Sequence, residues 1–271
     1  MAKQLIVSAD DYGLSLEVNE AVERAHRDGI LRSASLMVAV PATNDAIRRA
    51  RELPELRIGL HLVLVNGRPI LPADDVAALV DRNGELPRNL VAAGLRFFFH
   101  PRARRALEAE IRAQFEAFAR SGLHLDHVNA QNHMHVHPTV LGIIIKVGRE
   151  FGMQAVRIPE EPDDAAFLRP WLALMRRRLH RAHIATNDTV WGIRYSGHMT
   201  RDRVLAYLDR LPPGVCEMYF HPATGPWHGI DPQIADYDFA GELDALTSAE
   251  VRAKLDASGI ATLTYSDLRA C

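Results

Sequence analysis

Short apolar runs alternate along this chain with longer segments of helical spacing, and this alternation constrains the fold more than any other feature. Polar residues close each run, without hairpin turns, as expected for strands joined through helices. The expected strands are Gln4–Ala9, Ser33–Val40, Arg57–Val63, Leu123–Asn129, Ala155–Ile158, Thr189–Ile193, Val215–Phe220 and Ile260–Tyr265. The expected helices are Ser15–Asp28, Thr43–Glu52, Arg102–Ser121, Pro138–Phe151, Phe167–His183, Thr200–Leu211 and Gly241–Ser258.

Eight strands in 271 residues favour an α/β fold of the (β/α)8 TIM-barrel type, with a distorted barrel allowed and a doubly wound open sheet as the alternative. We expect one domain over residues 1–271, because no linker or repeat interrupts the pattern. The stretch 65–100 contains Pro69, Pro72 and Pro87 and has poor periodicity, which predicts an insertion after the third strand. In such barrels the active site lies at the carboxyl ends of the strands.

The composition excludes several classes of protein. The 32 basic and 34 acidic residues give a formal charge of −2, so no strong overall field attracts nucleic acid. The two cysteines cannot form a disulfide framework. The apolar runs are far shorter than the roughly 20 residues of a membrane-spanning helix, and the polar start does not resemble a signal peptide. A cytoplasmic protein is expected.

Ligand-type side chains follow the expected strands. Asp10 and Asp11 end the first strand, where adjacent side chains point in opposite directions; one carboxylate can bind a metal while the other acts as a base. Helix capping is an equally simple explanation for the pair alone. His61 lies within the apolar third strand, where a single histidine is usually a hydrogen-bonded core residue.

A histidine-rich segment follows the fourth strand and favours a functional role for Asp10, Asp11 and His61 over a structural one. Six imidazole or carboxylate groups lie within fourteen residues, which is hard to explain as surface composition. Alternate histidines cannot all reach one ion once the chain turns into a helix at Pro138, so one is expected to bind the metal and the others to line the pocket. His221 ends the seventh strand, with a packed or surface histidine as the alternative. The six groups are His124, Asp126, His127, His133, His135 and His137.

The ordered motifs ADDYGLS, GLHL, NHMHVHP and FHPA resemble those of the YdjC-type carbohydrate deacetylases, nearly from end to end of the chain. The segment HVNAQNHMHVHPTV is most similar to the branch associated with hopanoid biosynthesis. The resemblance implies a hydrolase that removes an N-acetyl group from an N-acetylglucosamine-containing glycoconjugate, with a glycosylated hopanoid lipid as the expected substrate and a chitooligosaccharide as the alternative.

The resemblance also implies roles for individual residues. Asp11, His61 and His133 would hold one divalent ion, with Asp10 as the general base and His221 as the acid. Alignment from the other end of the cluster would replace His133 with His127. The ion would be Mg²⁺ by resemblance, whereas two imidazoles and a carboxylate suit Zn²⁺ at least as well. The candidate substrate-binding residues are Tyr12, His135, His137 and Arg157.

Two other functions remain open at this stage. A histidine-rich, metal-dependent phosphoesterase could use the same fold, although such enzymes usually carry an HxH pair after strand one. A silent sugar- or metal-binding module is disfavoured by the presence of Asp10 and His221.

Partners are less constrained by the sequence. Peripheral contact with a membrane is considered for the helix around Arg176–Arg178 and for Phe97–Phe99 beside three arginines, and a homodimer is left open. The aromatics Trp171, Trp191, Tyr195 and Trp227 could stack on a sugar, but such residues more often belong to the core.

Overall fold

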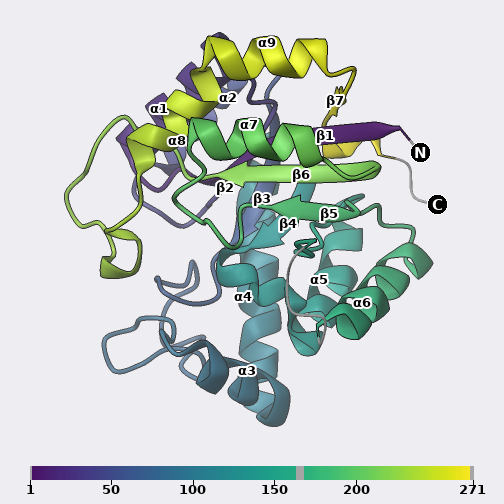
Figure 1. The fold of residues 1–271 in the computed structure, drawn as a ribbon. Coiled ribbons are helices and arrows are strands. Elements are labelled where there is room, and N and C mark those ends of the chain that lie inside the picture. The colour runs from purple at the N-terminus through teal and green to yellow at the C-terminus, as the bar shows by residue number, and fades with distance from the viewer. Residues whose placement is uncertain (1, 163–167, 269–271) are drawn as a thin grey trace.

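The computed structural model describes residues 2–162 and 168–268. At its centre a parallel sheet runs in the order β4-β3-β2-β1-β6-β5, and β7 pairs with the first half of β1 (Figure 1). The chain therefore has an α/β fold built on a parallel half-barrel sheet. The strands are β1 Lys3–Tyr12, β2 Ser33–Leu36, β3 Arg57–Leu62, β4 Leu125–Ala130, β5 Thr189–Trp191, β6 Gly214–Phe220 and β7 Ala261–Leu263.

The prediction of eight full strands is wrong at one position. Residues Ala155–Ile158 form no named strand and contribute only two isolated bridges, Val128 to Val156 and Ala155 to Ala185. These bridges extend the hydrogen bonding beyond β4 towards the segment before β5. Within residues 2–162 and 168–268 the strands do not form a complete eight-stranded barrel, since this stretch contributes only these two bridges.

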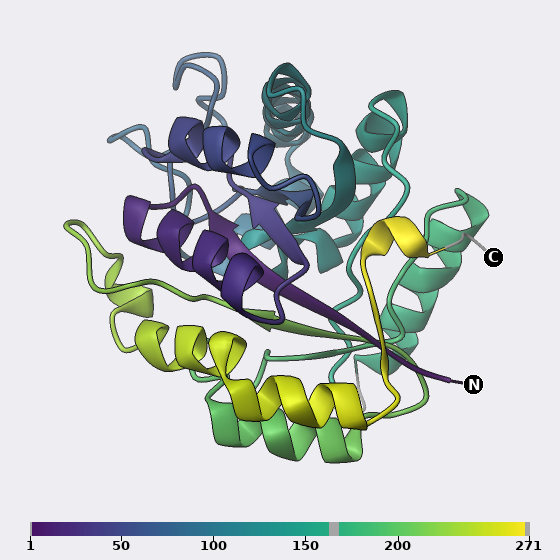
Figure 2. The ribbon, with the colours of Figure 1, turned by 90° about the horizontal axis from the view of Figure 1, so that it is seen from above.

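Helices surround the sheet, as Figure 2 shows from above. The expected helix Gly241–Ser258 is in fact two helices, because Ser248 is extended and its Oγ caps the second helix through the amide of Val251. Within the predicted insertion, α3 was not expected. Phe167, the predicted start of the fifth expected helix, lies outside the described residues. The helices are α1 Leu16–Asp28, α2 Thr43–Arg51, α3 Leu90–Phe99, α4 Pro101–Arg120, α5 Pro138–Glu150, α6 Arg169–Arg181, α7 Arg201–Arg210, α8 Phe239–Thr247 and α9 Ala249–Ala257.

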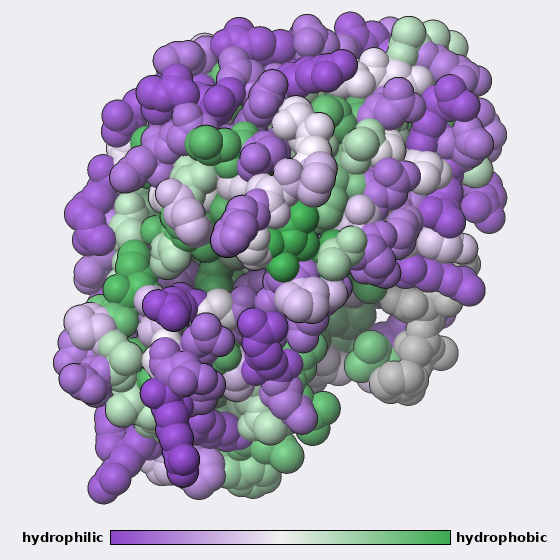
Figure 3. All heavy atoms as spheres, turned by 90° about the vertical axis from the view of Figure 1, so that its left-hand side faces the viewer, coloured by the Kyte–Doolittle hydropathy of each residue, from purple (hydrophilic) through white to green (hydrophobic). Residues whose placement is uncertain are grey.

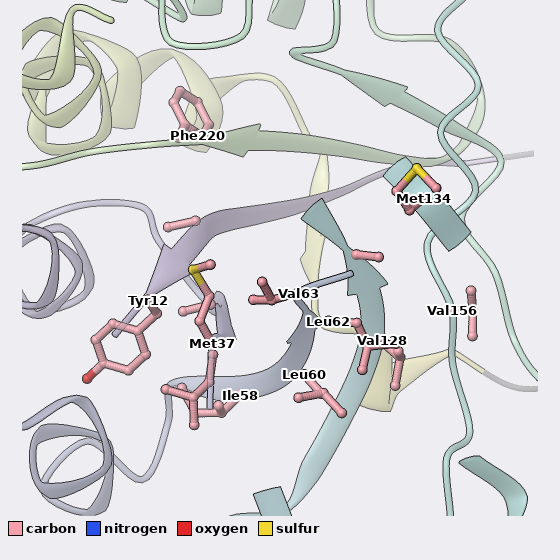
Figure 4. Packing of buried hydrophobic residues seen from close by; sticks show 14 of the residues in the cluster. Tyr12, Met37, Ile58, Leu60, Leu62, Val63, Val128, Met134, Val156 and Phe220 are labelled. Atoms are coloured by element: carbon pink, nitrogen blue, oxygen red, sulfur yellow. The ribbon is translucent and has the colours of Figure 1, made fainter. Parts of the chain in front are cut away.

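Alternate residues of the central strands form the core between sheet and helices. Ile58, Leu60 and Leu62 of β3 are at most 3% exposed and pack near Val128 of β4 (Figure 4). Truncating one such leucine to alanine costs about 2–5 kcal/mol in well-packed cores. This rigid base fixes the positions of the residues that follow the strands.

The parallel pairing brings the carboxyl ends of the strands to one edge of the sheet, on the left in Figure 1, where β6 points. In the described parts of the chain, every helix is too short or too polar to cross a bilayer.

Candidate functional site

A cavity of about 720 Å³ opens where the strands end. Figure 3 faces this side of the molecule, and a hollow near the middle of the view is bordered by both apolar and polar groups. Its wall contains all five residues predicted to hold metal or move protons: Asp10, Asp11, His61, His133 and His221. Residues separated by more than 200 positions in the sequence thus share one cavity.

Asp10 lies at the end of β1 with its carboxylate almost fully buried. Arg157 donates to both of its oxygens, at 2.5 and 3.0 Å, and Asn129 Nδ2 donates to Oδ1 at 3.0 Å. Burial alone would raise the pKa of Asp10, but the charge of Arg157, aided by the neighbouring His61 and His221 rings, holds this pKa well below its usual range. Asp10 is therefore ionised at neutral pH.

Arg157 joins Asp10 to a second buried carboxylate, that of Glu217 on β6. Its Nε and Nη2 lie 2.7 Å from the two Glu217 oxygens. Ser8 and Tyr265 donate to the same carboxylate at 2.5 and 2.7 Å. Because residues two apart on a strand share a face, Ser8 points to the same side as Asp10. The network is closed: each buried charge has an opposite charge and further hydrogen bonds.

Asp11 and His61 face each other across the cavity floor. Asp11 has a φ of 61°, which separates its side chain from that of Asp10. His61 Nδ1 lies 2.7 Å from Asn129 Oδ1, and Asn129 uses its Nδ2 to donate to Asp10 and Ser35. His61 Nδ1 then donates to Asn129 Oδ1, and the other ring nitrogen, Nε2, lies 3.4 Å from Asp11 Oδ1. Two electron-rich atoms at this separation suit a shared cation.

His133 lies on the same wall, where its ring contacts Tyr219. Its Nε2 is 3.3 Å from the Tyr219 hydroxyl, and its Nδ1 has no hydrogen-bond partner among residues 2–162 and 168–268. Burial, followed by the charge of Arg157, lowers the pKa of His133 to about 4, so the ring is neutral at pH 7. Within the same residues, no three His, Cys, Asp or Glu side chains converge closely enough to hold an ion. Asp11 and His61 fit a metal; His133 would have to rotate towards them.

His127, the alternative ligand, is placed elsewhere. Its Nδ1 lies 2.8 Å from Asp126 and its Nε2 lies 2.9 Å from Ser35 Oγ, so both nitrogens are used. The ring stacks on Tyr265 with centroids 4.5 Å apart. It also occupies the space above Gly59, where a Cβ would lie 2.5 Å from the ring. His127 does not contribute to the cavity wall, and its ring is hydrogen-bonded to Ser35 and Asp126 inside the protein.

His221 follows β6 and is held through its backbone. Its amide donates to the Glu242 carboxylate, which also accepts from the amide of Met199 at 2.8 Å. Burial raises the pKa of Glu242. The His221 ring lies between Tyr219 and Tyr237, with centroids 5.4 and 5.2 Å away. His221 thus contributes to the same cavity wall as the two aspartates.

The four residues predicted to bind substrate lie outside the cavity wall. Tyr12 is fully buried and donates to the Ala46 carbonyl at 2.8 Å. His135 is fully buried, with its Nε2 3.1 Å from the Arg157 carbonyl. His137 packs its ring against Phe97 and its neighbour Phe98. Arg157, as described above, is fully buried between carboxylates.

Three of the four aromatics considered for sugar stacking also lie away from the cavity. Only Trp227 contributes to its wall; Trp191 is 5% exposed and Trp171 donates to the Val136 carbonyl. Tyr219 and Tyr237 line the cavity and were not singled out from the sequence.

The cavity wall contains unusual backbone conformations. Five non-glycine residues have positive φ in the described ranges, and four of them, Asp11, Asn66, Asn132 and His133, line the cavity. Left-handed conformations cost free energy for residues that carry a Cβ. Asn66 and Asn132 are also joined, with Nδ2 of the first 3.0 Å from Oδ1 of the second.

A parallel α/β sheet with buried carboxylates and imidazoles gathered at the carboxyl ends of its strands has the arrangement typical of barrel-type enzymes. The chain belongs to the YdjC-like protein family, which it matches over residues 4–257. It is 32% identical over 274 residues to a carbohydrate deacetylase of Geobacillus stearothermophilus, covering 98% of each chain. It is 30% identical to a carbohydrate deacetylase of Brevibacillus brevis, covering 98% of this chain and 99% of the relative.

Solved structures agree with this fold. A protein of Enterococcus faecalis, whose description names cellobiose-phosphate cleavage, superposes with a TM-score of 0.81 at 25% identity over 99% of this chain and 100% of that one. An uncharacterised protein of Agrobacterium tumefaciens matches with a TM-score of 0.55 at 14% identity, over 98% of this chain and 88% of that one.

Proposed function

We propose that this chain is a metal-dependent carbohydrate deacetylase that hydrolyses the acetamido group of an N-acetylglucosamine-containing substrate. The observation that carries the proposal is the meeting of Asp10, Asp11, His61, His133 and His221 on one cavity wall. The printed names of the two bacterial relatives, which match over almost the whole chain, support the same activity.

The metal is part of this proposal. Asp11 and His61 would hold a divalent ion, because an imidazole nitrogen and a carboxylate oxygen lie 3.4 Å apart. His133 would be the third ligand, since its buried Nδ1 has no partner among the described residues. When bound, the ion would polarise the acetyl carbonyl and acidify a water molecule. Mg²⁺ and Zn²⁺ are both candidates; the two imidazoles favour the latter.

Asp10 and His221 divide the proton transfers. Asp10 is kept ionised by Arg157, and as the base it would take a proton from the attacking water as the new C–O bond forms. His221, in its protonated form, would give a proton to the amide nitrogen as the C–N bond breaks. The products are acetate, which contains the oxygen of the attacking water, and a free sugar amine, which receives a proton. His221 lies beside Tyr219 and Tyr237, which limit its rotation.

The substrate can be narrowed further. The first candidate is a glycosylated hopanoid lipid, because the sequence of residues 127–140 is most similar to the branch associated with hopanoid biosynthesis. The second candidate is a chitooligosaccharide. A phosphodiester remains the competing substrate class. The cavity volume of about 720 Å³ falls in the range of small-molecule sites and accommodates a sugar.

One assay separates these activities. The purified protein is incubated with a divalent metal in three parallel reactions. Each contains one substrate: a soluble N-acetylglucosamine conjugate, a chitooligosaccharide or a phosphodiester. The acetate and phosphate released are measured. Acetate release that Asp10→Asn lowers by about a hundredfold or more supports the proposal. Asp202→Asn, at a largely exposed carboxylate on α7, is the matched control and should leave turnover unchanged. Phosphate release without acetate would overturn the proposal.

A further inference from the structure

Helix α3 presents large apolar side chains to solvent. Val91, Leu95, Phe98 and Phe99 are 73, 56, 45 and 67% exposed, and we call these four residues the α3 apolar face. They follow a spacing of four, three and one residues, which places them on one side of a helix. The opposite side carries the buried Phe97 and packs against α4 and α5. Apart from the edge contact of the Phe98 ring with His137, at a centroid distance of 6.2 Å, the α3 apolar face is open to solvent in the described chain.

The sequence around this face carries only positive formal charge. Between Glu85 and Glu108 there is no Asp, Glu or Lys, and five arginines lie there beside His100, although the whole chain carries a formal charge of −2. One of the five, Arg88, pairs with Asp231 at 2.9 Å. The other four make no ion pair with any described residue; they are Arg96, Arg102, Arg104 and Arg105.

We infer that α3 docks the protein on the surface of an anionic lipid bilayer. A short helix with aromatic and aliphatic residues on one side and arginines beside it is the pattern of an interfacial helix. Its apolar side chains enter the boundary between headgroups and acyl chains, while each arginine near the surface is attracted to anionic lipid. An anionic bilayer therefore accounts for both the exposed apolar side chains and the arginines without ion-pair partners.

A second copy of the chain fits the same surface less well. In a two-fold dimer a patch meets its own copy, so the unpaired arginines of one protomer would face those of the other. Like charges brought together in this way oppose association. Charge complementarity thus favours an anionic surface over self-association.

The sequence also suggested α6 as a membrane-binding helix, and its packing argues against that. Leu172, Met175 and Leu179 are at most 4% exposed and form the stripe that faces the protein. Arg176 is engaged by Glu160 at 3.1 Å. The exposed residues include Arg169, Arg177 and Arg181, but only two large apolar side chains face solvent, Leu168 at 41% and Leu174 at 45%, against four on α3. This smaller apolar surface makes α6 a suitable control.

Docking through α3 would bring the cavity to the lipid surface. Leu90, the first residue of the helix, and Arg88 just before it both belong to the cavity wall. The sugar of a substrate anchored in the bilayer could then enter the cavity while its lipid part stays in the bilayer. The inference itself rests on the α3 surface and does not require the proposed deacetylase activity.

Vesicle co-sedimentation tests the inference directly. The full chain is mixed with phosphatidylcholine vesicles, with or without phosphatidylglycerol, at low and high salt. We expect pelleting with the anionic vesicles at low salt and its loss at high salt, because salt screens the arginines. Phe98→Ser/Phe99→Ser and Arg102→Gln/Arg105→Gln should each weaken binding about tenfold or more. Arg104 is left intact because it donates to the Phe98 carbonyl at the end of α3.

The control variant is Leu174→Ser/Arg177→Gln on α6, which should bind as the unmodified protein does. Circular dichroism and deacetylation of a soluble sugar identify variants that have misfolded. No pelleting at low salt, or pelleting that the α3 variants do not reduce, overturns the inference. Light scattering adds a second readout: a dimer that Phe98→Ser/Phe99→Ser converts to a monomer would assign the α3 apolar face to self-association and also overturn it.

Discussion

The guanidinium of Arg157 holds both carboxylate oxygens of Asp10, with Nη1 2.5 Å from Oδ2 and Nη2 3.0 Å from Oδ1. The same guanidinium binds both oxygens of Glu217, so a single side chain orients the proposed base and neutralises two buried carboxylates. Lysine cannot reproduce this geometry, because its ammonium group is a point charge without a planar fork.

Replacing Arg157 should therefore affect stability and catalysis in separable ways. Arg157→Met leaves two buried carboxylates unpaired and should lower the free energy of unfolding by about 3–5 kcal/mol in urea titrations. Arg157→Lys should fold better but lower kcat, because Asp10 loses its orientation. As a control, Arg27→Met removes an exposed pair with Glu23 and should cost less than about 1 kcal/mol. Equal costs for Arg157→Met and Arg27→Met would contradict this account.

Metal content distinguishes the two alignments of the histidine cluster. Asp11→Ala, His61→Ala and His133→Ala should each reduce bound divalent metal after dialysis, as measured by elemental analysis, because each removes a proposed ligand. His127→Ala should retain metal, since both nitrogens of that ring are used by Asp126 and Ser35. If His127→Ala loses metal while His133→Ala keeps it, the proposed ligand set is wrong.

Loss of the proposed acid should affect turnover more than binding. His221→Gln should lower kcat with little change in KM, because protonation of the leaving amine matters mainly in the transition state. His180→Gln on α6 serves as the matched control. An unchanged kcat with a raised KM would make His221 a residue that binds substrate.

Stability should fall as the pH drops below about 6.5. Burial lowers the pKa of His133 to about 4 and also lowers that of His135, so the folded state resists protonation where the unfolded chain accepts it. The unfolded state then binds more protons between about pH 6.5 and 4, and stability decreases through that window by up to about 1.4 kcal/mol per pH unit for each such histidine. Urea unfolding with a chelator present measures the slope. His133→Ala should reduce it; an unchanged slope would contradict the assigned shift.

The sequence predicted which residues share the cavity more successfully than how they are connected. Asp10, His61 and His221 were found because each ends or interrupts an apolar run, and parallel strands bring such positions to one edge. Their chemical roles remain predictions. The turn at Asn132–His133 could not be foreseen, because its left-handed backbone decides which histidine faces the cavity.

Local sequence patterns could not predict the buried hydrogen-bond network that joins Asp10, Asn129, Arg157 and Glu217. Asn129 and Glu217 act through partners 48 to 209 positions away, and such contacts depend on strand register and side-chain direction. Arg157 was a candidate for binding substrate, whereas in the fold its guanidinium is buried between Asp10 and Glu217. The same limitation explains the missed α3: its nearly uniform apolar composition lacks the periodicity that marks a helix packed on a core.

The positive-φ residues of the cavity wall have a consequence for anyone who wishes to make this protein more heat-resistant. Glycine at Asp11 or His133 would relieve the backbone, and selection for melting temperature alone would favour it, yet each exchange would delete a side chain that the chemistry needs. Stabilising substitutions are therefore best sought on the outer helices, and a gain in stability from the cavity wall should be treated as a warning of lost function.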